Sequence, residues 1–186
     1  YTFGADGDFT YEALFQRHES DLGNDLGNLA NRTISMAHRY FGAEMRPFQG
    51  TAPTVEGATV AATIAAAAGH WESFQPSRAL EETWRIVRGA NAYIDKSAPW
   101  KLSKVGDTAA LLEVISNCLE LVRLAALMVA PAMPNASSEL LRQLGRSADA
   151  GGWPEETWRG WPGGHLQEPK PVFPRLEPAR QEELVT

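Results

Sequence analysis

The apolar face of residues 108–128 constrains the fold of this chain more than any other feature. Large aliphatic side chains recur there at spacings of three and four residues, the repeat of one helix face. The face is broad and consists of Leu111, Leu112, Ile115, Leu119, Val122, Ala126 and Val129. A helix with so wide an apolar face needs other helices to cover it. The pattern therefore predicts the central helix of a helical bundle.

Capping residues and helix breakers delimit the other helices. Thr10 is a favourable N-cap, Gly42 a C-cap, and Pro76 suits the first position of a helix. Ser137 or Ser138 is expected to cap a short helix. The predicted helices span residues 11–20, 21–41, 58–74, 76–97, 108–128 and 137–144. Because only residues 170–176 alternate weakly with period two, the sequence predicts an all-α fold class, a bundle of about five or six helices.

The composition changes at residue 146. Six prolines and several glycines beyond this point exclude a regular helix, but Trp153, Trp158, Trp161 and Phe173 also lie there. A free linker would be poor in such aromatic residues. We therefore predict two parts, a helical bundle over 1–145 and an extended tail over 146–186 that packs back on the bundle.

Charge and cysteine content exclude several classes of protein. The 186 residues carry a formal net charge of −6, which argues against a nonspecific nucleic-acid coat protein. The segment 78–104 is locally basic, with six Lys and Arg against three Asp and Glu. The single cysteine, Cys118, excludes an internal disulfide and is expected to be an inert buried thiol. The four histidines show no ligand spacing, so we expect no metal, and no apolar run is long enough to predict a membrane span.

A polar residue interrupts the apolar stripe of the helix predicted over 76–97. Asn91 stands where the stripe formed by Leu80, Trp84, Val87 and Ile94 would continue. A buried amide costs free energy unless it forms hydrogen bonds. One interpretation is that Asn91 bonds a neighbouring helix and is structural. The other is that Asn91, Asp95 and Trp100 border a site for a planar, hydrogen-bonding ligand.

A second polar stripe lies on the helix predicted over 21–41. Asn24, Asn28, Asn31 and Arg32 cluster on one side of it, although asparagine is a weak helix former. They are either a solvated face, or asparagines that bond adjacent helices, or readers of nucleic-acid base edges. Amide and guanidinium groups suit base edges and tryptophan suits base stacking, a combination typical of single-stranded RNA recognition.

Two motifs then make the chain recognisable. DLGNDLGNLANRTISM (21–36) and NAYIDKSAPWKLSK (91–104) closely resemble the helical anticodon-binding domain of methionyl-tRNA synthetase, a class Ia synthetase. The opening 6–21 and PVFPRLE (171–177) extend the resemblance over nearly the whole chain. It implies that Trp100 stacks on an anticodon base, that Asn28 and Arg32 read base edges with a contribution from Asn91, and that Asp95 and Pro99 shape the same pocket.

The resemblance also implies where the chemistry resides. The HIGH and KMSKS signatures of the family's catalytic domain do not occur in these 186 residues, nor does its zinc-binding insertion. We therefore expect a C-terminal fragment of a bacterial methionyl-tRNA synthetase that is no enzyme on its own. ATP and possibly zinc would belong to the missing catalytic half. The expected partners are the anticodon loop of tRNA(Met) and the catalytic domain of the same polypeptide, in a cytoplasmic monomer.

Two alternatives remain open from the sequence. The first is the anticodon-binding domain of another class Ia synthetase, which the two motifs disfavour. The second is a free-standing helical module that binds protein instead of RNA, for which the aromatic residues of the tail could serve.

Overall fold

The fold is described by a computed structural model that covers residues 9–147, 152–154, 158–177 and 181. Residues 6–8 of the opening motif and 155–157 of the tryptophan-rich stretch lie outside the described residues. The all-α class predicted from the sequence is confirmed, since helices dominate and the strands are only two residues long. None of the described helices is both long and apolar enough to cross a membrane.

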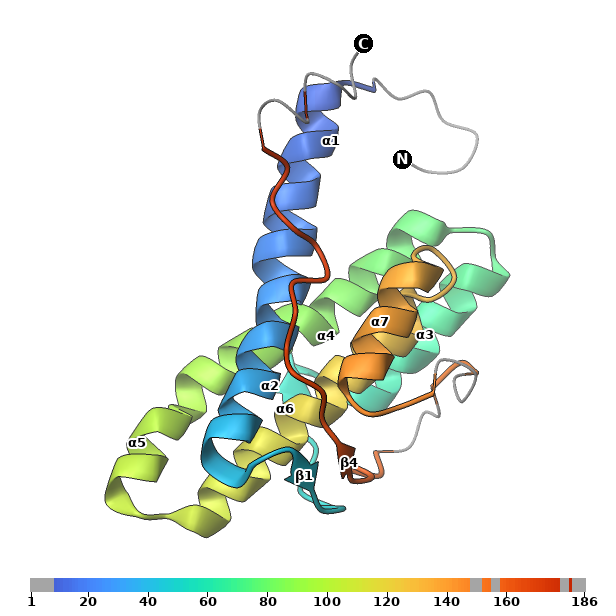
Figure 1. Cartoon of the computed structure of the whole chain (residues 1–186). Helices are drawn as coiled ribbons and strands as arrows, with labels where there is room; N and C mark the ends of the chain where they lie inside the picture. Colours follow the sequence, from blue (N-terminus) through green and yellow to red (C-terminus); the bar gives the residue numbers. More distant parts are fainter. Residues whose placement is uncertain (1–8, 148–151, 155–157, 178–180, 182–186) are drawn as a thin grey trace.

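Residues 11–41 form one continuous helix, where the sequence predicted two. It comprises α1 (Tyr11–Arg17), the π-helical η1 (His18–Gly27) and α2 (Asn28–Phe41), which make a single rod in Figure 1. Thr10 caps it by accepting a hydrogen bond from the Ala13 amide at 3.1 Å. Asp21 does not start a second helix because its carboxylate accepts hydrogen bonds from Arg17, one turn earlier, and from Ser20.

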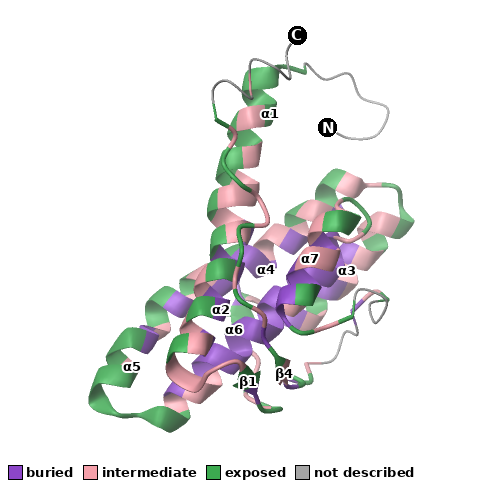
Figure 2. Ribbon diagram, viewed as in Figure 1, coloured by how far each residue is buried: buried purple, intermediate pink, exposed green. Residues whose placement is uncertain are grey.

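The body of the molecule is built around one helix. It contains α3 (Val60–Glu72), α4 (Pro76–Ser97), α5 (Pro99–Val105), α6 (Thr108–Val129) and α7 (Pro134–Gln143). Helix α6 packs against α2, α4, α5 and α7, and 16 of its 22 residues are buried. Figure 2 shows this burial concentrated in the middle of the molecule. The predicted central helix is therefore present.

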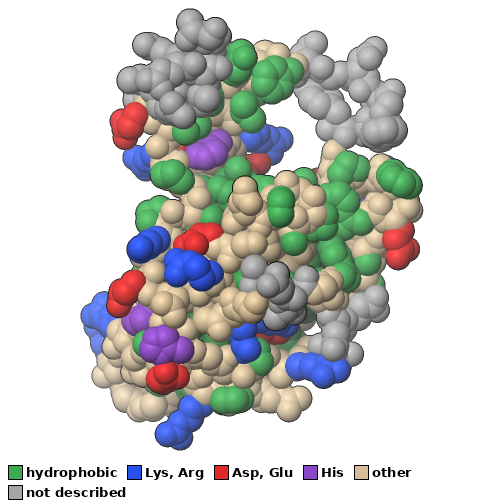
Figure 3. All heavy atoms as spheres, turned by 45° about the vertical axis from the view of Figure 1, so that its right-hand side comes forward, with side chains coloured by type: hydrophobic (Ala, Val, Ile, Leu, Met, Phe, Trp, Pro, Cys, Tyr) green, Lys and Arg blue, Asp and Glu red, His purple; other side chains and the backbone are tan. Residues whose placement is uncertain are grey.

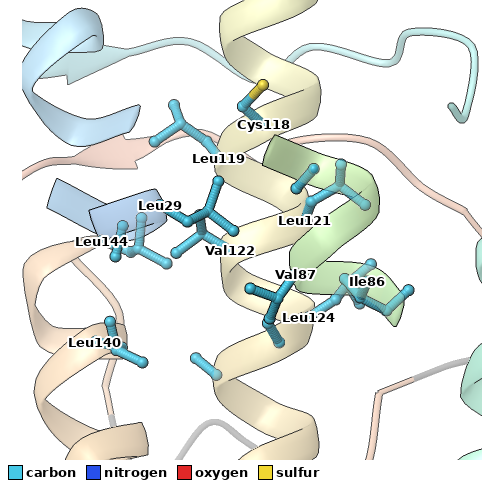
Figure 4. Close-up of a cluster of buried hydrophobic side chains, with 14 of the residues drawn as sticks. Leu29, Ile86, Val87, Cys118, Leu119, Leu121, Val122, Leu124, Leu140 and Leu144 are labelled. Carbon is cyan, nitrogen blue, oxygen red and sulfur yellow. The ribbon is translucent and has the colours of Figure 1, made fainter. Parts of the chain in front are cut away.

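The core is formed by side chains that different helices direct at α6. Figure 4 shows Leu29 of α2, Val87 of α4 and Leu140 of α7 around Leu119 and Val122. All five are fully buried. Leu26 of η1 and Leu29 of α2 supply part of this core, because neither has any exposed surface. Burial of such side chains contributes about 1.5–3 kcal/mol each.

Two details of the helix boundaries differ from the prediction. Helix α5 follows the proline break directly and was not predicted as a helix. Helix α7 begins at Pro134, so the predicted caps Ser137 and Ser138 lie inside it. Proline is favourable in a first helical turn because its missing N–H would have no partner there. Residues 170–176, weakly alternating in sequence, form no strand.

Two short antiparallel strand pairs form in the loops outside the helices. Strand β1 (Glu44–Met45) pairs antiparallel with β4 (Gly164–His165) in the register Glu44 to His165. Strand β2 (Thr54–Val55) pairs antiparallel with β3 (Ala58–Thr59) as a hairpin that lies on α4. The turn of this hairpin is clamped by an ion pair of 2.6 Å between Arg88 and Glu56.

The tryptophan-rich stretch packs on the loop that carries β1. Trp161 is 1% exposed, and the Arg146 guanidinium lies 5.4 Å from its ring centroid and donates to the Gly163 carbonyl. The Trp158 indole N–H donates to the Gly50 carbonyl at 2.9 Å. The division of the chain at 145/146 into bundle and tail stays a prediction.

Residues 171–177 run beside the N-terminal helix, as Figure 1 shows. Phe173 packs there, and its ring lies 6.4 Å from that of His18 in an edge-on arrangement. A side chain at Gly27 would place its Cβ 3.3 Å from the Phe173 ring, so this glycine permits the close approach of the tail. The two segments, more than 140 residues apart in sequence, are thereby joined.

Two glycines of the bundle provide a matched test of the packing. A Cβ at Gly89 would lie 2.6 Å from Val55 Cγ1, whereas one at Gly69 would have no neighbour within 4 Å. We expect Gly89→Ala to lower the free energy of unfolding by about 1–3 kcal/mol through overpacking. Gly69→Ala should raise it by about 0.5–1 kcal/mol through backbone entropy. Urea unfolding midpoints measure both, and stabilisation by Gly89→Ala would contradict the docked hairpin.

Candidate nucleic-acid interface

Helices α2 and α4 bring an arginine and an aspartate of the two polar stripes into contact. Arg32 on α2 donates from Nη2 to Asp95 Oδ1 on α4 at 2.8 Å. The two side chains are 32% and 64% exposed, so the pair is solvated and contributes little to folding, at most about 1 kcal/mol. What it does is hold the guanidinium in one orientation at the surface.

The turn between α4 and α5 positions the tryptophan. Ala98 adopts the left-handed conformation, with φ of 46° and ψ of 60°, and the buried Pro99 begins α5 immediately after it. This conformation costs a non-glycine residue about 1–2 kcal/mol. The turn places Trp100, which is 39% exposed, with its ring centroid 5.8 Å from Cζ of Arg32. Arg32, Asp95 and Trp100 therefore form one contiguous group.

The asparagines of the N-terminal helix are exposed to water. Asn24, Asn28 and Asn31 are all exposed, which fits a solvated face and not bonds to adjacent helices. Asn28 lies one α-helical turn before Arg32, so the two share a face. Asn24 lies in the π-helical segment, where i→i+5 bonding widens the turn, so the α-helical angle does not relate it to Asn28. Asn28 and Arg32 are the pair that can act together.

Asn91 is partly buried and bonds its own helix. Its Nδ2 donates to the Val87 carbonyl at 3.3 Å, one turn earlier on α4. The bond to a neighbouring helix that one interpretation expected is not the one that forms, because Val87 lies on α4 itself. The bond uses one N–H, so the side-chain carbonyl of Asn91 keeps its capacity to accept a hydrogen bond. Asn91 precedes Asp95 by one turn on the same helix.

Fewer basic side chains of the segment 78–104 carry an uncompensated charge than the sequence indicated. Within the basic segment 78–104, Arg85 and Arg88 are paired with carboxylates, both of them with Glu56. Lys96, Lys101 and Lys104 are exposed and form no ion pair with any described residue. These three lysines flank Trp100 at the end of α4 and on α5. Counting charges along the sequence could not distinguish these lysines from Arg85 and Arg88, because the ion pairs of the two arginines depend on the β2–β3 hairpin, which folds back onto α4.

The described part of the chain offers no sign of redox or metal chemistry at this corner. The Cys118 side chain is fully enclosed, as expected, and burial raises the pKa of its thiol. Among the described residues, no three His, Cys, Asp or Glu side chains lie close enough to hold a metal ion. The chemistry available is hydrogen bonding, stacking and charge, which suits binding.

Solved structures show which class of protein has this architecture. The chain aligns with methionyl-tRNA synthetase of Mycobacterium tuberculosis in its free state with a TM-score of 0.81 and 32% identity, over 96% of this chain and 37% of that one. The same synthetase bound by methionyl-adenylate gives 0.79 and 32%, over 94% and 35%. The fold is thus that of a helical region of an aminoacyl-tRNA synthetase.

Sequence comparison identifies the region. Residues 49–185 match the family described as the anticodon binding domain of methionyl tRNA ligase, so the chain belongs to that family. Methionine–tRNA ligases of Oceanobacillus iheyensis and Caldanaerobacter subterraneus are 34% and 36% identical to it, over 94% of this chain. The chain spans 27% and 28% of the length of these two relatives. The matched range contains Asn91, Asp95, Pro99 and Trp100 but begins after Asn28 and Arg32.

Proposed function

We propose that the chain binds the anticodon loop of methionine tRNA through the corner formed by α2, α4 and α5. The observation that carries the proposal is the exposed Trp100 indole, held beside the Arg32 guanidinium by the Ala98 turn. The exposed indole offers a flat face on which a ligand can stack. An unpaired loop base supplies such a ligand, because its flat face stacks on indole and its edge remains free for hydrogen bonds.

The polar groups around Trp100 would read that edge. Arg32 offers several donors in one plane, and Asn28 and Asn91 each offer a donor beside an acceptor. Asp95 fixes Arg32 in register, and the buried Pro99 fixes the indole. Since all of these residues lie on helices or at a helix start, the site is held by rigid elements.

Three lysines that form no ion pair within the described part of the chain complete the proposed site. Lys96, Lys101 and Lys104 would contact the phosphates on either side of the stacked base, which position RNA without reading its sequence. Their charge is local, since the whole chain has a net charge of −6. A short loop is therefore favoured over a long duplex as the ligand.

The relatives indicate the setting of this binding. We infer that the chain acts within a methionyl-tRNA ligase, whose remainder ligates methionine to tRNA, uses ATP and holds any zinc. We further propose that it works without a cofactor of its own, in the cytoplasm and as a monomer. The family match disfavours another class Ia synthetase. A free-standing protein-interaction module would bind no tRNA, and this outcome of the experiment below would favour it.

Binding of a stem-loop with the CAU anticodon tests the proposal. We expect this RNA to bind more tightly than one with a single anticodon base exchanged, because a replaced base edge leaves donors of the site unpaired. Each mismatch should cost about 1–3 kcal/mol. Fluorescence anisotropy at moderate salt measures both dissociation constants. Equal affinity for the two stem-loops would refute base recognition.

Replacement of Trp100 by alanine should weaken binding of the CAU stem-loop by about 1–3 kcal/mol, the contribution of one base–aromatic stack. Trp100→Phe should recover part of the loss. Phe74→Ala is the matched control, because Phe74 is also an exposed aromatic residue but lies between α3 and α4, outside this site. An equal loss in the control, or none in a folded Trp100→Ala protein, would contradict the stacking role.

Variants of Arg32 and of Lys101 should affect different properties of RNA binding. Arg32→Ala should reduce discrimination between the cognate and exchanged stem-loops. Lys101→Ala should weaken both alike and lower the slope of log K against log salt by about one unit. Affinities at several salt concentrations separate the two roles. A changed salt slope without loss of discrimination in Arg32→Ala would make Arg32 a phosphate contact.

A further inference from the structure

Charged side chains of both signs lie on the face of the molecule shown in Figure 3, whereas the interior holds few polar ones. Among the described residues, eight polar or charged residues are buried. Thr83 of α4 bonds within its own helix, since its hydroxyl donates to the Ala79 carbonyl one turn earlier. Asn117 of α6 differs, because its side chain bonds two other segments of the molecule.

Asn117 connects a loop and a second helix from within the core. The residue is 1% exposed, and its Nδ2 donates to the Thr51 carbonyl at 3.0 Å and to the Tyr93 hydroxyl of α4 at 3.2 Å. Thr51 belongs to the loop between β1 and β2, so three segments meet at one amide. Both N–H groups of the amide are thereby used.

The arrangement around Asn117 is unfavourable for stability. Its Oδ1 atom is buried and has no hydrogen-bond partner among the described residues. A buried acceptor without a partner costs free energy, and an apolar side chain at this position would carry no such cost. Core stability therefore does not account for this amide, and the connections that it makes call for another role.

The loop at Thr51 is itself firmly held. The Trp158 indole N–H donates to the Gly50 carbonyl, and the Thr51 amide donates to Glu113 Oε1 at 3.4 Å. A Cβ at Gly50 would lie 2.8 Å from Asn117 Oδ1, so a side chain there would displace the amide. The loop thus gives Asn117 a fixed support from which to hold α4.

Tyr93, the other partner of Asn117, lies on the side of α4 opposite the proposed RNA site. Asn91 and Asp95 are each two residues from it, which corresponds to about 200° around an α-helix. The hydrogen bond from Asn117 therefore holds α4 from behind, on the side turned away from Asn91 and Asp95.

The Tyr93 hydroxyl also lies near the end of α4. Burial raises the pKa of Tyr93, against the opposite effects of Asn117 and of Ser97, so the Ser97 side chain lies beside the same hydroxyl. Ser97 is the last residue of α4 and directly precedes the Ala98 turn, which carries Trp100. A rotation of this last turn would move the indole.

We propose that Asn117 and Tyr93 are positioning residues of the RNA site. Their hydrogen bond pins the rear of α4 to α6 and to the neighbouring loop, so that Asp95 and Trp100 keep their places at the surface. Neither Asn117 nor Tyr93 touches the RNA. The inference rests on the proposed function and adds to it two residues that support the site from within the molecule.

Removal of one hydroxyl tests this role. Tyr93→Phe keeps the ring in place but deletes the acceptor of the Asn117 bond, and we expect CAU stem-loop affinity to fall about three- to tenfold. Thr83→Val is the matched control, because it deletes a buried hydroxyl from the same helix and should leave the affinity unchanged. Equal losses in the two variants, or no loss in Tyr93→Phe, would overturn the inference.

Coupling to Trp100 separates positioning from stability. In the Tyr93→Phe background, Trp100→Ala should cost less affinity than in the wild-type chain, by a factor of about three, because a displaced indole has less stacking to lose. In the Thr83→Val background Trp100→Ala should have its full effect. A purely structural role of Tyr93 would leave the effects additive in both backgrounds, and that result would overturn the inference.

A second variant reaches the same hydrogen bond from the loop. Gly50→Ala would displace the Asn117 amide, so it should reduce CAU stem-loop affinity and the coupling to Trp100 as Tyr93→Phe does. Gly69→Ala is its control, because a Cβ there would meet nothing within 4 Å. Circular dichroism checks that both variants fold. Unchanged binding by folded Gly50→Ala would contradict the support of the site by the loop.

The indole N–H resonance of Trp100 in NMR spectra tells failure of this inference from failure of the proposed function. The resonance is assigned by its loss in Trp100→Phe, and without RNA it should shift in Tyr93→Phe but not in Thr83→Val. Such a shift in a chain that binds no stem-loop would support the positioning of Trp100 and overturn the proposed function. Normal stem-loop affinity with an unshifted resonance would overturn only the positioning.

Discussion

Helix α6 removes most of its surface from water, and the rest of the molecule is arranged to make this possible. Helices α2, α4, α5 and α7 each cover part of it. The hydrophobic effect is non-directional, so it explains why these helices surround α6 but does not set the angles at which they cross it. The close packing of individual side chains, such as Val55 against Gly89 on α4, decides how each neighbour sits.

The position of the proposed site at Arg32, Asp95 and Trp100 depends indirectly on this packing around α6. Arg32 and Asp95 are 63 residues apart, and they meet only because α2 and α4 both pack near α6. The strained Ala98 conformation persists because Ile94 below it and Pro99 after it are buried. The packed core thereby fixes the orientation of the Arg32 and Trp100 side chains. The solvated Arg32–Asp95 ion pair itself adds little to stability.

The two ends of the molecule differ in how they are built. The corner at α5 consists of rigid helical positions on which Arg32 is paired with Asp95 beside Trp100. The opposite end is an exposed helix with apolar side chains, little contact with the body and a π-helical joint, η1, behind it. Because helices α1, η1 and α2 are continuous, the exposed apolar end of this helix and Arg32 share one backbone element.

The sequence by itself determined the all-α class, the central helix and the motif that places Trp100 after Pro99, because helix periodicity and proline geometry are local properties. The sequence could not determine that residues 11–41 form a single helix. In the structure the Asp21 side chain bonds Arg17 on the preceding turn and does not begin a new helix. Only the tertiary structure decided that Asn91 bonds Val87 and that Glu56 forms ion pairs with both Arg85 and Arg88. It also decided that Lys96, Lys101 and Lys104 have no ion pair among the described residues. These outcomes depend on which distant segments are brought together, and that is settled by packing around α6.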